Sequence, residues 1–323
     1  MKYVSFLILL LLSLTAGAQT KSGQKTAEPN AGEGLDAFLL RNGYNVQLYK
    51  PAFIELNKKH LGKNNSLLSG VKYVFPEKEN VAYEPLLGEK NAKVNIESSE
   101  LKGATFYLVS GHGGPDPGAM GNYDKHDLYE DEYAYDIMLR TARKMLSKGA
   151  NVHIIIQDPD DGIRDDAYLS YDDHETCCGK AIPLDQNQRL QQRSDAINDF
   201  YTKERKGYCR SIFFHLDSRS TEKRIDVFFY HYTKSVKGER LARSLRDKFD
   251  AKYKQHQPNR GFNGTVSERQ LYVLKATNPP AVFLELGNIQ NSQDLQRFNK
   301  VDNREALANW ITEGCVDDFK KGK

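Results

Sequence analysis

The 323-residue sequence has few cysteines, no strong excess of charge of either sign and, after its first residues, no long apolar run. Its four cysteines, Cys177, Cys178, Cys209 and Cys315, are too few for a disulfide framework in a chain of this length. They allow three pairings, between which the sequence does not choose, and the adjacent Cys177 and Cys178 are expected to pair elsewhere or stay free. No C-x-x-C pair is present, which argues against a cysteine-based metal site. The formal net charge of +3 argues against a nucleic-acid-binding protein, which needs a clustered basic face.

The first 18 residues are predicted to be a secretory signal peptide. Lys2 provides the positive start, residues 6–12 form a short apolar core, and Ala16-Gly17-Ala18 provides the small residues of a cleavage site. The apolar core is too short to span a bilayer as a helix, and no later stretch is long enough. Cleavage would remove one lysine and no acidic residue, so the net charge would fall from +3 to +2. A buried N-terminal helix is the alternative, but it would not require this order of residue types.

Residues 34–76 are predicted to form a small α+β module. Apolar residues at helical spacing are followed by Gly70 and by a short apolar strand that ends at Pro76. The segment resembles a LysM module in its opening Gly34-x-x-Ala37, its central Glu55-Leu56-Asn57 and its closing pattern over residues 67–76. The resemblance implies a βααβ unit that binds N-acetylglucosamine-containing glycans such as peptidoglycan. An unrelated helical cap on the main domain is the alternative.

The segments on either side of this module are predicted to lack a core of their own. Residues 19–33 are small and polar, and we expect a flexible leader. Residues 77–100 are charged and have no sustained period, so we expect a linker. Residues 101–318 are assigned to one further domain.

Strands and helices alternate throughout this domain. Strands are expected at 105–109, 152–156, 211–215, 224–232, 271–274 and 281–286, and helices at 131–148, 186–204, 235–253 and 304–314. The alternation predicts an α/β fold, a three-layer sandwich with a twisted, mainly parallel central sheet flanked by helices.

Residues 158–175 form a strongly acidic segment. They include eight acidic residues against one arginine and show neither a helical nor a strand period. The segment follows the carboxyl end of a predicted strand, where α/β folds place functional loops. A lid, a cation-binding loop and a solvated turn are the three interpretations, of which the solvated turn is the simplest.

Two histidines lie where predicted strands end. His112 stands in Gly111-His112-Gly113-Gly114, where glycines let the backbone turn sharply and keep the imidazole accessible. His215 follows the apolar run Ile212-Phe213-Phe214 and ends the predicted strand. A lone histidine in an apolar strand is usually a core residue, but two at one edge of a sheet favour a metal site. A carboxylate beside them would complete a His₂Glu catalytic zinc site with its fourth position left to water.

Three glutamates are candidates for the carboxylate chemistry. Glu130 and Glu132 open the helix after the His112 loop, although acidic residues there also favour the helix dipole. Glu285 lies within the hydrophobic strand 281–287, where an unpaired charge would cost on the order of several kcal/mol. A charged residue that ends a buried strand is a functional candidate.

Residues 101–323 resemble the zinc-dependent N-acetylmuramoyl-L-alanine amidases of the amidase_3 type. Four blocks carry the resemblance in the order of the family. They are Gly111-His112-Gly113-Gly114-Pro115-Asp116-Pro117-Gly118-Ala119, Glu130 at the start of its helix, Ser211-Ile212-Phe213-Phe214-His215, and Leu271-Tyr272-Val273-Leu274 with Pro280-Ala281-Val282-Phe283-Leu284-Glu285-Leu286-Gly287-Asn288-Ile289-Gln290-Asn291. Arg193 and Asn198 match the arginine and asparagine on the helix before the second histidine.

The resemblance implies that His112, Glu130 and His215 bind one Zn²⁺ ion and that Glu285 is the catalytic glutamate. Helix phase favours Glu130, because Tyr135, Met138, Ala142 and Met145 then occupy the apolar positions of the family. Glu132 is the alternative ligand, although it would place Arg140 on the buried face of the helix.

The implied reaction is hydrolysis of the amide bond between N-acetylmuramic acid and the L-alanine of the stem peptide. Peptidoglycan is then the partner, an activator protein is a further candidate partner, and the location is the periplasm or cell envelope, as in Gram-negative members. Another zinc-dependent cell-wall peptidase and a non-catalytic peptidoglycan-binding protein with an amidase fold are the alternatives.

Two positions depart from the family pattern. Gln157 stands where the family often has arginine after the second strand, and Asp217 stands where asparagine is common two residues after the second histidine. Neither is an implied ligand, so the departures bear on substrate contacts.

Overall fold

The computed structural model describes residues 24–204, 207–218 and 226–322. The predicted signal peptide at residues 1–18 lies outside these ranges. The chain divides into two compact units, Met1–Glu79 and Asn80–Lys323. No helix within the described ranges is long and apolar enough to cross a membrane.

The smaller unit has a β–α–α–β order. Its main elements are β1 (Thr26–Ala27), α1 (Leu35–Arg41), α2 (Val46–Asn57) and β2 (Tyr73–Val74), with a short 3-10 helix at Lys63–Asn65. β1 pairs with β2 in antiparallel register, and the Asn57 side chain joins α2 to β2 through hydrogen bonds with both backbone groups of Val74. The core is mainly aromatic and includes Phe38, Tyr44, Phe53, Tyr73 and Phe75. Since β1 lies within residues 19–33, the ordered unit begins before residue 34, and this part of the segment is not the leader that we expected.

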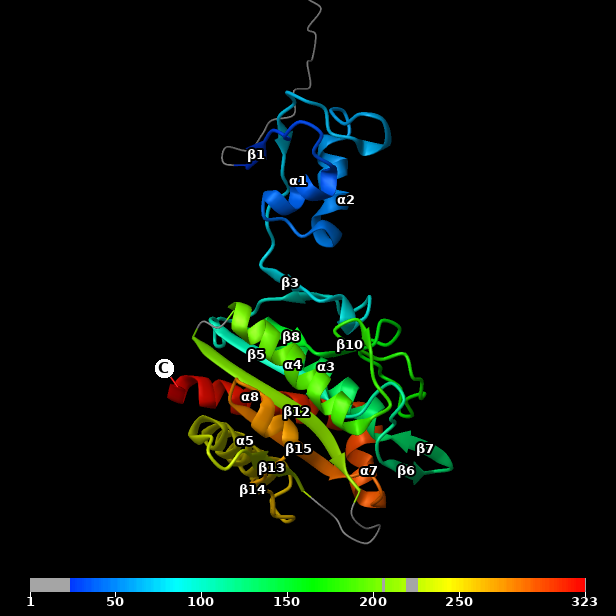
Figure 1. Cartoon of the computed structure of the whole chain (residues 1–323), viewed down its shortest axis with the longest axis vertical. Coiled ribbons are helices and arrows are strands. Elements are labelled where there is room, and N and C mark those ends of the chain that lie inside the picture. The colour runs from blue at the N-terminus through cyan, green and yellow to red at the C-terminus, as the bar shows by residue number, and fades with distance from the viewer. Residues whose placement is uncertain (1–23, 205–206, 219–225, 323) are drawn as a thin grey trace, which may run out of the picture. The chain divides into compact units, whose positions relative to one another are not determined.

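A six-stranded sheet forms the centre of the larger unit (Figure 1). Its strands, in spatial order, are β14 (Thr265–Glu268), β13 (Phe228–His231), β15 (Ala281–Asn288), β12 (Tyr208–Asp217), β5 (Ala104–Ser110) and β8 (Asn151–Ile154). All neighbouring pairs are parallel except β13 and β15, which are antiparallel. The predicted α/β class with a mainly parallel sheet is therefore confirmed.

Helices cover both faces of this sheet. α3 (Glu130–Ser147), α5 (Val236–His256) and α8 (Val301–Gly322) pack on one face around a large apolar core, which α7 (Ser292–Asn299) extends. α4 (Gln186–Glu204) and α6 (Tyr272–Ala276) pack on the other face (Figure 1). Alternate residues of β12 point into the cores on the two faces. Ile212 and Phe214 pack in the core under α3, α5 and α8, and Phe213 packs in the core under α4 and α6. The result is the three-layer arrangement that we expected.

Smaller elements surround the sheet. They are the hairpins β3 (Val81–Tyr83)/β4 (Lys93–Asn95) and β6 (Met120–Tyr123)/β7 (His126–Tyr129), a 3-10 helix at Pro85–Leu87, and a three-stranded sheet of β9 (Ile156–Gln157), β10 (Thr176–Cys177) and β11 (Lys180–Ala181). The four cysteines all lie in the described ranges, and none of them forms a disulfide bond there.

Two further local predictions differ from the structure. Residues 77–100 are not only a linker, because the β3/β4 hairpin buries Leu87 and Val94 in the core of the larger unit. Residues 271–274 are not a strand but lie mostly in helix α6. Residues 271–274 are a short apolar run, for which periodicity does not separate strand from helix, and the strands of the β3/β4 hairpin have only three residues each.

Candidate active site

Three neighbouring strands end at the candidate site. β5, β12 and β15 are parallel, so their carboxyl ends meet at one edge of the sheet. His112 follows β5, His215 lies in β12, and Glu285 of β15 is the register partner of His215. Sheet pairing thus brings together three predicted site residues from distant parts of the sequence.

The carboxylate of Glu130, the first residue of α3, completes the group. Glu130 Oε1 lies 3.2 Å from His112 Nε2 and 2.9 Å from His215 Nδ1. These two nitrogens and one oxygen match the protein ligands of a catalytic zinc site. Tetrahedral ligands about 2.0–2.2 Å from a zinc ion are roughly 3.4 Å apart, which is close to these separations.

Asp116 holds the His112 ring from its other side. Asp116 Oδ2 lies 3.0 Å from His112 Nδ1 and accepts a hydrogen bond from Arg189 Nη2 at 2.7 Å. The hydrogen bond from His112 holds the pKa of Asp116 below its usual range, so this carboxylate is an acceptor. His112 therefore donates from Nδ1 and directs Nε2 to the centre, which is how supporting carboxylates orient metal-binding histidines.

The two imidazoles differ in their electrostatic surroundings. Burial lowers the pKa of His215, which favours the neutral ring that binds metals. Burial also disfavours the charged form of His112, but hydrogen bonds to Asp116 and Glu130 outweigh it and raise the pKa to about 10. Burial alone would raise the pKa of Glu130, yet its hydrogen bonds with both histidines lower it, so the carboxylate is ionised. A metal ion at His112 Nε2 would therefore compete with a proton.

Gly111 leaves the space that the His215 ring occupies. A Cβ atom at residue 111 would lie 2.3 Å from His215 Cε1 and 2.4 Å from its Nδ1. His112 itself has a positive φ of 55°, a conformation that is uncommon outside glycine and that often marks functional sites. The glycine-rich turn is thus a steric requirement of the two-histidine arrangement.

The structure brings Glu130, and not Glu132, to the histidines. Glu132 Oε2 instead pairs with Arg164 Nη2 at 2.6 Å. Our phase argument against Glu132 was nevertheless wrong, because Arg140 is buried, with its Nε 2.8 Å from Asp136 Oδ2. A buried arginine is tolerated there because acidic partners neutralise it.

Glu285 lines the same cavity as the three candidate metal ligands. The cavity has a volume of about 700 Å³, and its wall includes His112, Glu130, His215 and Glu285. Phe283 stacks on the His215 ring, with centroids 4.1 Å apart, and so limits movement of the imidazole. Asp217, which replaces the common asparagine of the family, also lines the cavity.

Several polar residues support the site from α4. Arg193 is buried and donates to the backbone oxygen of His112, and burial lowers its pKa to about 10. Asn198 bonds with Ala276 and Asn278 and so fixes the segment that leads into β15. The supporting roles of Asp116 and Arg189 were not predicted from the sequence. For Asp116, its position four residues after His112 is a signal that could have indicated this role.

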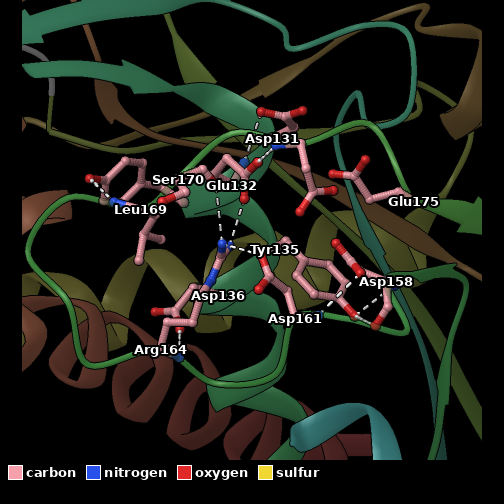
Figure 2. Close-up of polar contacts among 12 residues, drawn as sticks. Asp131, Glu132, Tyr135, Asp136, Asp158, Asp161, Arg164, Leu169, Ser170 and Glu175 are labelled. Carbon is pink, nitrogen blue, oxygen red and sulfur yellow. Dashed lines mark hydrogen bonds and ion pairs between the residues drawn. The ribbon is translucent and has the colours of Figure 1, made fainter.

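The acidic segment 158–175 is more than a solvated turn. Asp158, Leu169 and Glu175 are buried, and Arg164 links the segment to Glu132 of α3 (Figure 2). Burial and the charges of Glu132 and Glu175 raise the pKa of Asp131 to about 9. Burial also raises the pKa of Glu175 to about 7, against a hydrogen bond from Gly114 N. The segment therefore forms a buried acidic group next to α3.

Residues 107–317 match the Amidase_3 family, described as N-acetylmuramoyl-L-alanine amidase. The germination-specific N-acetylmuramoyl-L-alanine amidase of Bacillus subtilis is 24% identical over 226 residues, which cover 69% of this chain and 82% of that protein. The probable cell wall amidase LytH of Staphylococcus epidermidis is 29% identical over 233 residues, which cover 71% of this chain and 62% of its relative.

Solved structures align with a similar share of the chain. The CwlD amidase of Clostridioides difficile, in complex with the GerS lipoprotein, is 20% identical with a TM-score of 0.49, and the alignment covers 67% of this chain and 98% of that one. The N-acetylmuramoyl-L-alanine amidase AmiC2 of Nostoc punctiforme is 19% identical with a TM-score of 0.46, covering 68% and 97%.

We expect Gly111→Ala to weaken zinc binding by about 10–100-fold, the scale seen when support for a metal ligand is lost. The added methyl group would displace the His215 ring from Glu130. Competition with a chromophoric chelator measures the affinity. Gly34→Ala is the control, because a Cβ atom there meets nothing within 4 Å. Equal affinities for the Gly111→Ala and wild-type chains would contradict the steric argument.

Proposed function

The chain belongs to the N-acetylmuramoyl-L-alanine amidase family, and we propose that it hydrolyses the amide bond between N-acetylmuramic acid and L-alanine in peptidoglycan. The observation that carries the proposal is the convergence of His112, Glu130 and His215 beside Glu285 in one cavity. An amide is a stable bond, so its hydrolysis requires both an activated nucleophile and stabilisation of the developing oxyanion.

His112, Glu130 and His215 would hold zinc. When bound, the ion supplies an activated water nucleophile near neutral pH and polarises the scissile carbonyl. Asp116 and Arg193 keep the two sides of the His112 residue in place, one at the ring and one at the backbone. The protein thereby fixes the ligand geometry before the substrate binds.

Glu285 is the proposed general base and general acid. It stands beside His215 in the sheet, so its distance from the metal ligands is set by strand pairing. Its carboxylate would accept a proton from the attacking water and pass it to the leaving amine. This placement on a rigid strand suits a group that must act on two sides of one reaction.

A muropeptide digest tests the reaction. Purified peptidoglycan incubated with the zinc-loaded chain should release intact stem peptides and leave glycan strands with free lactyl ends, as measured by mass spectrometry. A chelator should abolish the release. New ends within the stem peptide would instead identify a peptidase, and a lack of products would support a non-catalytic binding protein.

We expect Glu285→Gln and Glu285→Ala to retain zinc and to lose about 10²–10⁴-fold in kcat, since general acid–base catalysis contributes on this scale. Zinc content and the rate of stem-peptide release are measured on the same samples. Glu268→Gln is the matched control, because Glu268 is an exposed glutamate on β14. Full activity of either Glu285 variant would refute the catalytic assignment, and loss of zinc would reassign Glu285 to metal binding.

We also propose that the smaller unit binds glycan strands in the manner of a LysM module. Its β–α–α–β order and antiparallel β1/β2 pairing support this proposal, together with the sequence resemblance over residues 34–76.

Deletion of residues 19–79 should weaken sedimentation with insoluble peptidoglycan about tenfold or more, as expected when one of two linked binding modules is removed. Hydrolysis of soluble muropeptide fragments should be unchanged, which serves as the internal control. Undiminished sedimentation would show that the larger unit alone binds the polymer.

The cellular setting follows from the proposed substrate. Peptidoglycan lies outside the inner membrane, which agrees with the predicted signal peptide at residues 1–18 and a periplasmic or envelope location. These features and an activator protein stay predictions from the sequence.

A further inference from the structure

Three buried carboxylates converge outside the proposed zinc centre. They belong to Asp131 and Glu132 in the first turn of α3 and to Glu175 at the end of the acidic segment (Figure 2). One oxygen from each lies within 4.8 Å of the others. The three residues are 1%, 2% and 5% exposed, respectively.

The carboxylate of Asp131 has an oxygen without a partner. Asp131 Oδ1 accepts a hydrogen bond from the backbone N–H of Glu132 at 2.9 Å. Asp131 Oδ2 is inaccessible to solvent and has no hydrogen-bond partner among the described residues. Buried polar atoms in folded proteins almost always have a partner, so this oxygen indicates a ligand.

The positive charge nearby does not balance these carboxylates. Arg164 Nη2 lies 2.6 Å from Glu132 Oε2, but the same guanidinium also pairs with Asp161. Glu175 Oε2 accepts from Gly114 N at 2.7 Å, which supplies a dipole and no full charge. In the described ranges no cationic side chain lies within ion-pair distance of Asp131 or Glu175. Two of the three carboxylates are therefore without a counter-charge.

A second acidic group nearby does not show the same lack of partners and counter-charge. Asp158, Asp161 and Asp172 also approach one another within 4.8 Å. Asp158 Oδ1 accepts from two backbone N–H groups, however, and Asp161 pairs with Arg164. Ordinary turn contacts account for this group, so it carries no proposal.

We propose that Asp131, Glu132 and Glu175 bind a hard divalent cation of the calcium or magnesium type, at a site separate from the zinc centre. Carboxylate oxygens are the ligands that these ions prefer, and the group offers neither the imidazole nor the thiolate that favours zinc. A divalent ion would supply the positive counter-charge that the described side chains do not provide to Asp131 and Glu175. It would also join the end of segment 158–175 to the helix turn that carries Glu130.

The test uses the zinc-loaded full chain in buffer freed of other metals. After equilibrium dialysis against about 1 mM Ca²⁺ or, separately, Mg²⁺, a concentration typical of extracellular calcium sites, elemental analysis should find one further metal ion per chain. The zinc content should not change. The thermal midpoint should rise by about 2–4 °C.

Asp131→Asn and Glu175→Gln should each lose the further ion and the thermal shift. Asparagine at residue 131 keeps the Oδ1 acceptor for Glu132 N, so this variant is expected to fold. Asp173→Asn is the matched control, since Asp173 lies exposed in the same segment and the substitution removes the same charge. This variant should still bind the ion.

Three results would overturn the proposal. They are no further ion bound by the wild-type chain, a fall in zinc equal to the uptake of the added ion, and equal loss of binding in Asp173→Asn and Asp131→Asn. The wild-type stoichiometry decides alone whether a second cation binds, even if a variant does not fold. Comparison of the two ions then distinguishes calcium from magnesium.

Discussion

The carboxylate of Glu130 joins three parts of the fold that the chain separates. One of its oxygens faces both His112 and His215 and accepts from Leu216 N at 3.0 Å, while the other accepts from Ala119 N at 2.9 Å. Helix α3, the glycine-rich turn and strand β12 are therefore fixed to one another through a single side chain. Because α3 packs on the core of the sheet, this packing fixes the position of the Glu130 carboxylate.

A buried ionic network joins the middle of α3 to α8 and to the acidic segment 158–175. Asp136 of α3 pairs with Arg140 and with Arg304 of α8, and Arg304 also donates to backbone oxygens of Arg164 and Asp166 at 2.8 Å. Removing one partner from such a network typically costs about 3–5 kcal/mol, because the remaining charge stays buried. The network thus holds residues 164–166 of the acidic segment against α3 and α8.

Strand–helix alternation predicted the α/β class because buried parallel strands are nearly continuous apolar runs, and five of the six expected strands are present. The same reasoning placed His112, His215 and Glu285 at strand ends. His112 does follow β5, but β12 continues past His215 to Asp217 and β15 continues past Glu285 to Asn288. Residues 271–274 were assigned wrongly because four apolar residues fit either a strand or helix α6. The β3/β4 hairpin was missed because its strands have only three residues each.

Local sequence patterns were enough to predict the fold class and to place His112, His215 and Glu285 in or directly after buried strands, because these features follow from residue type and short-range spacing. Which glutamate faces the histidines depends on three-dimensional packing, since Glu130 and Glu132 both open α3 and the phase argument from Arg140 does not hold. The tertiary structure also decided that Asp116 orients His112 and that Asp131 meets Glu175. Such contacts depend on the geometry of turns and on distant ion pairs, and local sequence patterns do not encode these distances.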